Sequence, residues 1–236
     1  MSNGYFRFQQ FEIKQDKTAM KVSTDGILLG SLCDFSLSTN ILDIGTGTGL
    51  IALMSAQRSK AKISAVEIDK DAFLQAQENV LNSKFALRIK VFNDDFLNFY
   101  NYCNEKFDYI VSNPPFFENS YKSNDYKRNF ARHTDSLPFE KMILGVKKLL
   151  SEDGFFSVII PNKCSLDFIK ICALNGIHLT RKTKIFSKPN SVELRHVLTF
   201  SKQILPFNKN EIIIYNENGL YTECYKNLTK DFYFKF

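Results

Sequence analysis

The segment 41–49 (Ile-Leu-Asp-Ile-Gly-Thr-Gly-Thr-Gly) constrains the fold more than any other part of the chain. It begins as a short, mostly apolar run at 40–44, which is typical of a buried strand. Three glycines follow, and a helical pattern begins at Leu50. Because glycine tolerates positive φ and lets a ligand touch the backbone, the segment predicts a ligand-binding loop. In α/β sheets such loops lie at the carboxyl ends of the strands.

The same alternation of strand and helix patterns continues along the chain and predicts parallel β-α-β units. The expected strands are 40–44, 62–67, 87–92, 106–112 and 155–160, and the expected helices are 50–59, 69–83, 137–150 and 164–174. A turn at 151–154 separates the third of these helices from the last strand. Residues 5–11 alternate like a strand. Two antiparallel hairpins are expected near the end, pairing 179–186 with 192–201 and 212–215 with 220–224.

Composition places the chain among soluble globular proteins. Its 236 residues are 44% hydrophobic and 24% charged, which suits one domain, 1–236, without an evident linker. No apolar run approaches the roughly 18–20 residues of a membrane span, and the polar N-terminus lacks a signal-peptide core. Five cysteines form no CxxC pair, so neither a metal site nor disulfides are expected. We therefore expect a cytoplasmic protein without metal, and a monomer is favoured.

The glycine loop fits one class of ligand better than two others. A dinucleotide fingerprint requires Gly-x-Gly-x-x-Gly, but the third position here is Leu50. A P-loop fails because no Gly-Lys-Ser/Thr follows. The spacing instead resembles motif I of the class I S-adenosylmethionine-dependent methyltransferases. The candidate cofactor-binding residues are Asp43, Gly45, Thr46 and Gly47, and a glycine turn without a ligand stays the alternative.

Acidic residues after the next two strands support this interpretation. Glu67 lies 22 residues after Gly45, where a carboxylate can accept two hydrogen bonds from ribose hydroxyls. Asp95 and Phe96, which come after the third strand, are also candidate cofactor-binding residues. In the resembling families this acid binds the adenine amine of the cofactor. Asp94 is the rival for that role, and either acid could instead cap the next turn.

The run Asn113-Pro114-Pro115-Phe116 follows the fourth strand, 68 residues after Gly45. The Asn113 amide oxygen and the Pro114 carbonyl offer two acceptors, the prolines fix φ, and Phe116 offers a flat face. Such acceptors can hold the hydrogens of a planar amine and turn its lone pair toward an incoming methyl group, so that positioning supplies much of the rate. The run resembles motif IV of the amino-methyltransferases. Asn113 is thus a candidate for both catalysis and cofactor binding; a plain proline turn is the alternative.

Positive charge is concentrated in one stretch. The net charge is +6, yet residues 117–200 hold 14 Lys and Arg against 8 Asp and Glu, while the rest of the chain balances at 17 each. A local positive field favours a nucleic-acid partner, although a solvated surface would give the same count. The candidate RNA-binding residues lie in the loop 122–133 and in the first hairpin: Lys122, Arg128, Arg132, His133, Lys182, Lys184, Lys188 and Arg195.

Several segments together resemble one family over nearly the whole chain, the bacterial valine-tRNA adenine-37 N-6-methyltransferases. They are Phe8 to Phe11, Ala19 to Gly30, Ala131 to His133 and Leu228 to Tyr233. The resemblance implies a Rossmann-like class I methyltransferase fold, with a mostly parallel seven-stranded sheet, helices on both faces and an antiparallel hairpin at one edge. It also implies an N-terminal segment, 1–39, that covers the cofactor, and a β-rich C-terminal extension, 202–236.

The same resemblance implies the activity. The cofactor would be S-adenosyl-L-methionine, with its methionine end approached by Lys21, Thr24 and Asp25. The substrate would be a valine tRNA, methylated at the adenosine 3′ of the anticodon. The family has tyrosine where this chain has Phe116, so stacking survives while a hydroxyl hydrogen bond is lost. Another planar amine (an rRNA or DNA base, or a protein glutamine) and a non-catalytic RNA-binding relative stay open as alternatives.

Overall fold

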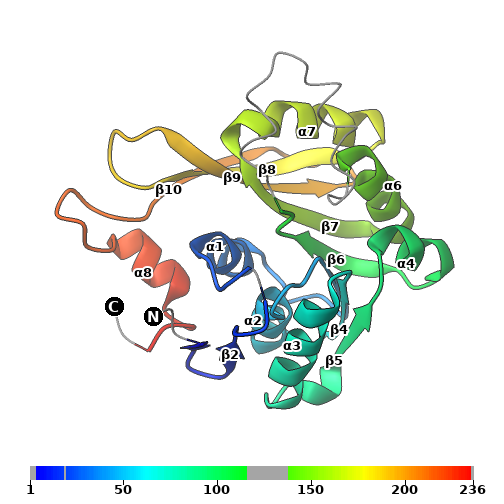
Figure 1. Cartoon of the computed structure of the whole chain (residues 1–236). Coiled ribbons are helices and arrows are strands. Elements are labelled where there is room, and N and C mark those ends of the chain that lie inside the picture. The colour runs from blue at the N-terminus through cyan, green and yellow to red at the C-terminus, as the bar shows by residue number, and fades with distance from the viewer. Residues whose placement is uncertain (1–3, 19, 116–137, 235–236) are drawn as a thin grey trace, which may run out of the picture.

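The computed structural model describes residues 4–18, 20–115 and 138–234. Its centre is an eight-stranded sheet in the order β10-β8-β9-β7-β6-β3-β4-β5 (Figure 1). The strands are β3 (Asn40–Ile44), β4 (Lys62–Glu67), β5 (Ile89–Asn93), β6 (Phe107–Ser112), β7 (Leu150–Pro161), β8 (His178–Phe186), β9 (Glu193–Ser201) and β10 (Asn208–Ile213). All pairs are parallel except those that β9 makes with β7 and β8.

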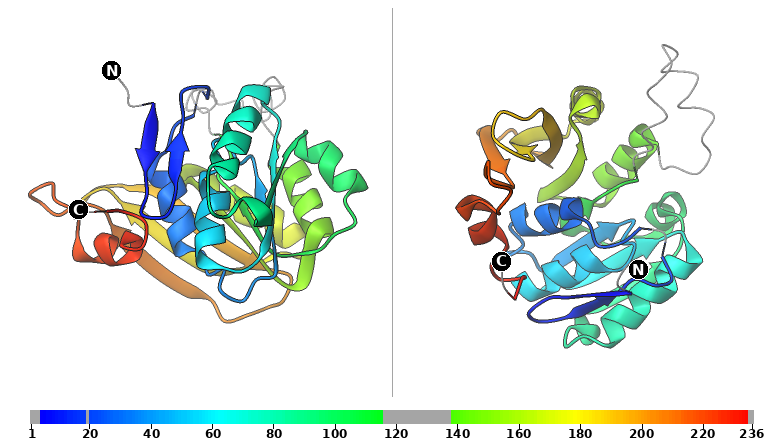
Figure 2. Two further views of the ribbon diagram at one scale, coloured as in Figure 1. Left: turned by 90° about the horizontal axis from the view of Figure 1, so that it is seen from below. Right: turned by 60° about the vertical axis from the view of Figure 1, so that its left-hand side comes forward.

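Helices cover both faces of the sheet and close two separate cores (Figure 2). The helices are α1 (Thr24–Leu32), α2 (Leu50–Arg58), α3 (Lys70–Leu81), α4 (Phe96–Tyr102), α6 (Phe139–Leu149), α7 (Asn162–Leu174) and α8 (Glu223–Thr229), with a 3₁₀ turn η1 (Ala86–Arg88). Because side chains alternate along a strand, Ile41 joins the core under α1, α2 and α3, while Leu42 joins the core under α4, α6 and α7.

The two ends of the chain pack against each other. The hairpin β1 (Tyr5–Arg7) and β2 (Glu12–Lys14) lies beside α8, and both chain ends appear at the same side in Figure 1. The backbone N–H of Gln9 donates to Phe232 O at 2.9 Å, and its side-chain amide donates to Lys230 O at 2.7 Å. Phe8 and Tyr225 are buried in one core. The N-terminal segment is therefore held by the residues that follow α8.

Two predictions for the second half were wrong in detail. The hairpin expected at 212–215 and 220–224 is reduced to one bridge between Tyr215 and Tyr221. Residues 208–213 instead pair in parallel with β8 as an eighth strand, and 223–229 form α8, capped by the Thr222 side chain. An unpaired edge of β8 offers more backbone hydrogen bonds than a short local hairpin, and Ile212 becomes buried there.

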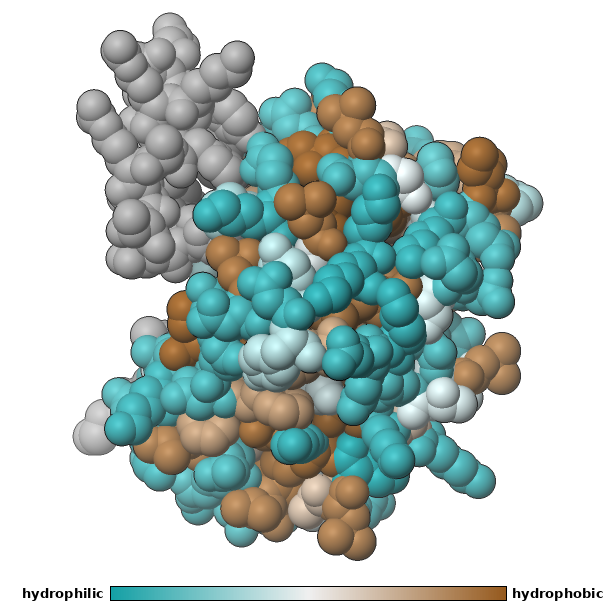
Figure 3. Space-filling model, turned by 90° about the vertical axis from the view of Figure 1, so that its right-hand side faces the viewer, coloured by the Kyte–Doolittle hydropathy of each residue, from teal (hydrophilic) through white to brown (hydrophobic). Residues whose placement is uncertain are grey.

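The turn expected at 151–154 is an irregularity inside β7. The register passes from Phe107 opposite Leu150 to Tyr109 opposite Phe155, so the strand bulges without leaving the sheet. Gly154 fits the close approach this requires, since a Cβ there would lie 2.8 Å from a Leu150 methyl. On the face shown in Figure 3, hydrophilic and apolar residues are interspersed. Among the described residues, no helix has the length and hydropathy needed to cross a membrane.

Candidate active site

Four loops leave the sheet at neighbouring positions on its carboxyl edge. Ile44 pairs with Ser112 on one side and with Val66 on the other, and Glu67 pairs with Asn93. The Ser112 hydroxyl also donates to Ile44 O at 3.0 Å. The residues that follow these strands, which include the glycine loop and Asn113, therefore lie side by side. The two motifs that the sequence singled out face the same edge of the sheet.

The glycine loop is held open by backbone geometry. Gly45 and Gly47 have φ of +69° and +57°, and a Cβ on either would meet no atom within 4 Å. The N–H groups of Gly45 and Thr46 both donate to Val66 O, at 2.9 and 3.1 Å. The loop thus folds back on β4 while its outer surface faces open space. A ligand can therefore lie in direct contact with the backbone of this loop.

Asp43 is fully buried beneath this loop. Its Oδ2 accepts a hydrogen bond from Thr46 Oγ1 at 2.6 Å, whereas Oδ1 has no partner within the described ranges. Burial raises the pKa of this carboxyl to about 7; Thr46 and the backbone N–H of Ala52 oppose the rise, and the nearby Glu67 adds to it. A buried acceptor without a partner is costly, so it marks a place where a ligand group can compensate.

Glu67 does more than the sequence predicted. Its Oε2 accepts the N–H of Gly47 at 2.8 Å, and its Oε1 accepts the N–H of Asp69 at 3.0 Å. The carboxylate therefore clamps the glycine loop to the start of α3. Each oxygen retains a second lone pair, so the predicted contact with two hydroxyls is compatible with this geometry.

The rival acids after β5 have different surroundings. Asp95 caps α4 by accepting the N–H of Leu97 at 2.8 Å through Oδ1. Asp94 accepts the Tyr102 hydroxyl at 2.8 Å through Oδ2, and a long contact from the Asn98 amide reaches its Oδ1. Asp94 thus has both oxygens engaged and Asp95 has one, but each oxygen retains a second lone pair, so both acids stay candidates for the adenine amine.

The side chain of Phe96 lies in the hydrophobic core. It is 4% exposed and packs against α6, where a Cβ on Gly145 would lie 2.6 Å from its ring. The predicted cofactor contact of Phe96 is thereby limited to its backbone.

Asn113 lies half-buried beside the first turn of α1, and Pro114 is buried. A Cβ built on Gly26 would lie 3.9 Å from Asn113 Nδ2 and 3.0 Å from a methyl of Leu50. The Ser23 side chain caps α1 by accepting the N–H of Gly26 at 3.2 Å. The structure thus brings the start of α1, the glycine loop and the Asn113 loop together.

The other predicted cofactor residues follow from this placement. Lys21 is exposed just before the helix, Thr24 is exposed at its start, and Asp25 is half-buried. Five predicted residues lie outside the described ranges: Phe116, Lys122, Arg128, Arg132 and His133.

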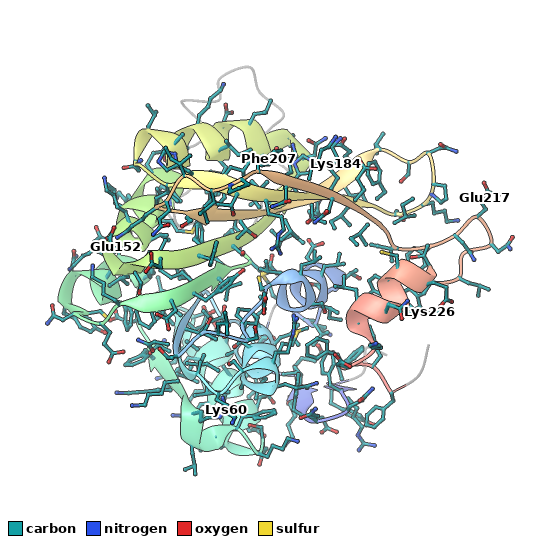
Figure 4. All side chains as sticks on the ribbon, turned by 180° about the vertical axis from the view of Figure 1, so that it is seen from behind. Lys60, Glu152, Lys184, Phe207, Glu217 and Lys226 are labelled. Atoms are coloured by element: carbon teal, nitrogen blue, oxygen red, sulfur yellow. The ribbon has the colours of Figure 1, made fainter. Side chains whose placement is uncertain are left out.

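The basic hairpin reaches the same edge of the sheet. Pro161 at the end of β7 pairs with Arg195 near the start of β9, and Lys188 is exposed in the turn between β8 and β9. Lys184, labelled in Figure 4, is ion-paired with Glu193. Lys182 lies opposite Lys209 of β10, and burial and both neighbouring lysines lower its pKa, although Glu193 opposes them.

One predicted cofactor residue and one predicted RNA residue contact each other directly. Arg195 Nε donates to Asp25 Oδ2 at 2.9 Å. Sequence reasoning placed these residues in different sites, because 170 positions separate them along the chain. In the fold, the pair joins the hairpin to the first turn of α1.

Asn79 on α3 is an important residue that the sequence analysis missed. Its Oδ1 accepts Lys14 N, and its Nδ2 donates to both Lys14 O and Thr48 O, each at 2.9 Å. Gln75, one turn earlier, accepts the N–H of Lys17 at 3.1 Å. These two buried amides dock the N-terminal segment onto α3 and the glycine loop. Their spacing of four on the buried face of a helix is the signal that could have identified them.

Comparison with known proteins agrees with this geometry. Residues 23–168 match the methyltransferase small domain model. A tRNA1(Val) (adenine(37)-N6)-methyltransferase of Phocaeicola vulgatus is 45% identical over 99% of each chain. One of the same name from Trichodesmium erythraeum is 44% identical over the full length of both.

Solved structures agree on the fold. A predicted O-methyltransferase from Agrobacterium tumefaciens has a TM-score of 0.69 at 20% identity, covering 88% of this chain and 96% of that one. A ribosomal protein L11 methylase from Lactobacillus delbrueckii has a TM-score of 0.59 at 17% identity, covering 81% and 84%. With the glycine loop, the Asn113 loop and these full-length matches in agreement, the chain belongs to the methyltransferase small-domain family, in the branch of relatives named tRNA1(Val) (adenine(37)-N6)-methyltransferases.

Proposed function

We propose that this enzyme transfers a methyl group from S-adenosyl-L-methionine to the 6-amino group of adenine-37 in a valine tRNA, in the cytoplasm. The observation that carries the proposal is the pairing of Ile44 with Ser112, because it brings the glycine loop and Asn113 to adjacent positions on one edge. The reaction requires a methyl donor and a flat amine within a few ångströms of each other. Relatives that share 42–45% of their residues with this chain carry the name of this activity.

The residues of the glycine loop fit S-adenosyl-L-methionine. Gly45 and Gly47 leave open space where a side chain would stand, and Asp43 Oδ1 lacks a partner among the described residues. In our assignment Glu67 accepts hydrogen bonds from the ribose hydroxyls and Asp95 accepts one from the adenine amine. The segment with Lys21, Thr24 and Asp25 meets the methionine end. When bound, the cofactor supplies an electrophilic methyl group on a positively charged sulfur.

Asn113 and Pro114 orient the amine of the substrate. The lone pair of an exocyclic amine is delocalised into the ring, so the free amine is a poor nucleophile. In our proposal the Asn113 side-chain oxygen and the Pro114 carbonyl accept its two hydrogens, which turns the lone pair out of the ring plane. Both groups are neutral acceptors and take up no proton themselves. The nitrogen becomes acidic once it carries the methyl group, and its excess proton is released to water. Positioning, rather than a strong base, then accounts for much of the rate.

The hairpin supplies the surface for the tRNA backbone. Lys188 lies in the turn at the carboxyl edge of the sheet, and Lys182 and Lys209 lie opposite each other farther back along β8 and β10. Phosphates are the groups such cations bind. Lys184 is held by Glu193 and would need to exchange that partner for a phosphate. The predicted cations of the segment 122–133 would extend this surface.

The test is methyl transfer by purified protein to unmodified valine tRNA, followed by mass spectrometry of the nucleosides. We expect N-6-methyladenosine at position 37, and we expect Asn113→Ala to lower kcat by at least a hundredfold while S-adenosyl-homocysteine still binds. Asn101→Ala, at an exposed asparagine of α4, is the matched control and should keep full activity.

Activity retained in Asn113→Ala would refute the role of that residue. Methylation of another base or of a protein glutamine, with valine tRNA left unmodified, would refute the assigned substrate.

A further inference from the structure

An irregularity at the start of β9 sets the direction of two neighbouring side chains. Ile185 of β8 lies opposite Arg195, but the next residue, Phe186, lies opposite Glu193, so Leu194 is an extra residue in β9. Such bulges turn side chains relative to a regular strand and recur beside active sites. Without the bulge, Glu193 and Arg195 would point to the same face of the sheet.

The two residues instead contact different groups. Glu193 forms an ion pair with Lys184, and its Oε2 accepts a hydrogen bond from Nε2 of the buried His196 ring at 2.8 Å. Arg195 reaches α1, where its Nε lies 2.9 Å from Asp25 Oδ2. The acidic side chain that could compete for the guanidinium is thereby occupied elsewhere.

The ion pair is neither fully exposed nor isolated. Both side chains are 31% exposed, so solvent screens the pair only in part. The guanidinium also donates from Nη1 to Leu194 O at 3.2 Å, which fixes its orientation on the bulge. Arginine has five N–H donors in a planar fork, so donors remain for a phosphate after these two bonds.

The partner of Arg195 lies next to the residue that approaches Asn113. Asp25 is followed by Gly26, which has so little space that a Cβ would lie 3.0 Å from Leu50 and 3.9 Å from Asn113 Nδ2. A displacement of the first turn of α1 therefore alters both the glycine-loop side and the Asn113 side of the site. Because residue 26 is a glycine, its backbone itself lies against Leu50 and Asn113, and no side chain there could shift to absorb the movement.

We propose that Arg195 is a positioning residue, which acts through Asp25 to hold the first turn of α1 against the Asn113 loop and so aligns the amine with the methyl donor. The expected effect on catalysis rests on the proposed function, whereas the contact between Arg195 and Asp25 does not. It also gives tRNA binding an effect on the cofactor site: a phosphate on the remaining donors of Arg195 would fix the guanidinium further, and with it Asp25. Binding of each ligand would then strengthen binding of the other by the same factor.

The experiment compares Arg195→Gln with Lys202→Gln. The control removes an ion pair at 2.7 Å with Glu152, at the opposite end of the same strands, as the labels of Glu152 and Lys184 in Figure 4 indicate. The first readout needs no ligand: hydrogen exchange of the backbone amides of residues 23–33. We expect at least threefold faster exchange in Arg195→Gln and no change in Lys202→Gln.

The second readout is calorimetry with S-adenosyl-homocysteine in the absence of RNA. We expect Arg195→Gln to lower the affinity about three- to tenfold and Arg195→Lys to recover part of it, because an ammonium still pairs with Asp25. In an Asp25→Asn background the Arg195→Gln change should have no further effect, since the two residues act as one unit.

The third readout is kcat with saturating cofactor and tRNA. We expect a loss of at least tenfold in Arg195→Gln, beyond any change in the KM for tRNA. Unchanged exchange and unchanged S-adenosyl-homocysteine affinity in Arg195→Gln would overturn the proposal and leave Arg195 as a phosphate contact alone. A wild-type enzyme inactive on valine tRNA would overturn the proposed function, whereas the two RNA-free readouts would still decide the role of Arg195.

Discussion

Replacing Asp43 by asparagine would remove a carboxyl that the fold keeps at a cost to its own stability. Burial raises the pKa of Asp43 from 3.8 to about 7 in the folded protein, whereas the unfolded chain exposes it with its ordinary pKa. Between about pH 4 and 7 the folded state therefore holds a proton that the unfolded state has released. The contribution of this group to stability then falls as the pH rises through that window and stays constant above it.

The size of the effect follows from the difference between the two pKa values. A difference of about 3 corresponds to about 4 kcal/mol at ~1.36 kcal/mol per pH unit, which is an upper bound because the site can relax around the charge. Asparagine keeps an acceptor for Thr46 Oγ1 and carries no charge. We therefore expect Asp43→Asn to exceed the stability of the wild type by ~1–2 kcal/mol at pH 5 and by ~2–4 kcal/mol at pH 8.5.

Urea unfolding between pH 5 and 8.5 measures this, with far-ultraviolet circular dichroism as the probe because the chain has no tryptophan. The Thr46→Val variant is a second test. It removes the hydrogen bond that favours the ionised carboxyl, so it should raise the pKa further and extend the pH dependence. A stability difference between wild type and Asp43→Asn that does not change with pH would refute the reasoning. We also expect Asp43→Asn to bind S-adenosyl-homocysteine more weakly, as a residue retained for a ligand should.

Three further predictions concern other parts of the molecule. Asn79→Ala should lower the free energy of unfolding by ~1–3 kcal/mol in urea titrations, because it removes hydrogen bonds to the buried Thr48 O and to two part-buried backbone groups of Lys14; a loss below about 0.5 kcal/mol would contradict this. Gly145→Ala should destabilise by ~1–3 kcal/mol in thermal unfolding, since its Cβ would lie 2.6 Å from the Phe96 ring, whereas a stabilised protein would show that the helix has room there. The double change Lys182→Glu with Lys209→Glu should weaken tRNA binding and reduce the slope of log affinity against log salt by about 2, measured by filter binding, with S-adenosyl-homocysteine affinity as the unchanged control.

Much of the site could be predicted because its motifs are local. A strand that runs into Gly45 and Gly47 needs only neighbouring residues to define its backbone, and both glycines adopt the positive φ that was expected. The end of α7 obeys a similarly local rule, since Gly176 at φ +74° follows the cap at Asn175. The spacing between Gly45 and Asn113 then sufficed to place both at one edge, since consecutive parallel strands point the same way.

Contacts between distant segments could not be predicted in this way. The pairing of Asn79 with Lys14 depends on how the N-terminal segment crosses α3, and no local pattern encodes that crossing. The burial of Phe96 depends on α6, which lies some forty residues later in the chain.

The sequence by itself determined the alternation of strands and helices between 40 and 174, the open glycine loop and the position of Asn113 after its strand, because backbone preference and hydrophobic periodicity act over a few neighbouring residues. Only the tertiary structure decided that β10 joins β8, that Glu67 clamps the glycine loop, and that Arg195 pairs with Asp25. Each of these contacts depends on strand register and on which side chains of remote segments meet, and a one-residue bulge is enough to turn a side chain to the other face of the sheet.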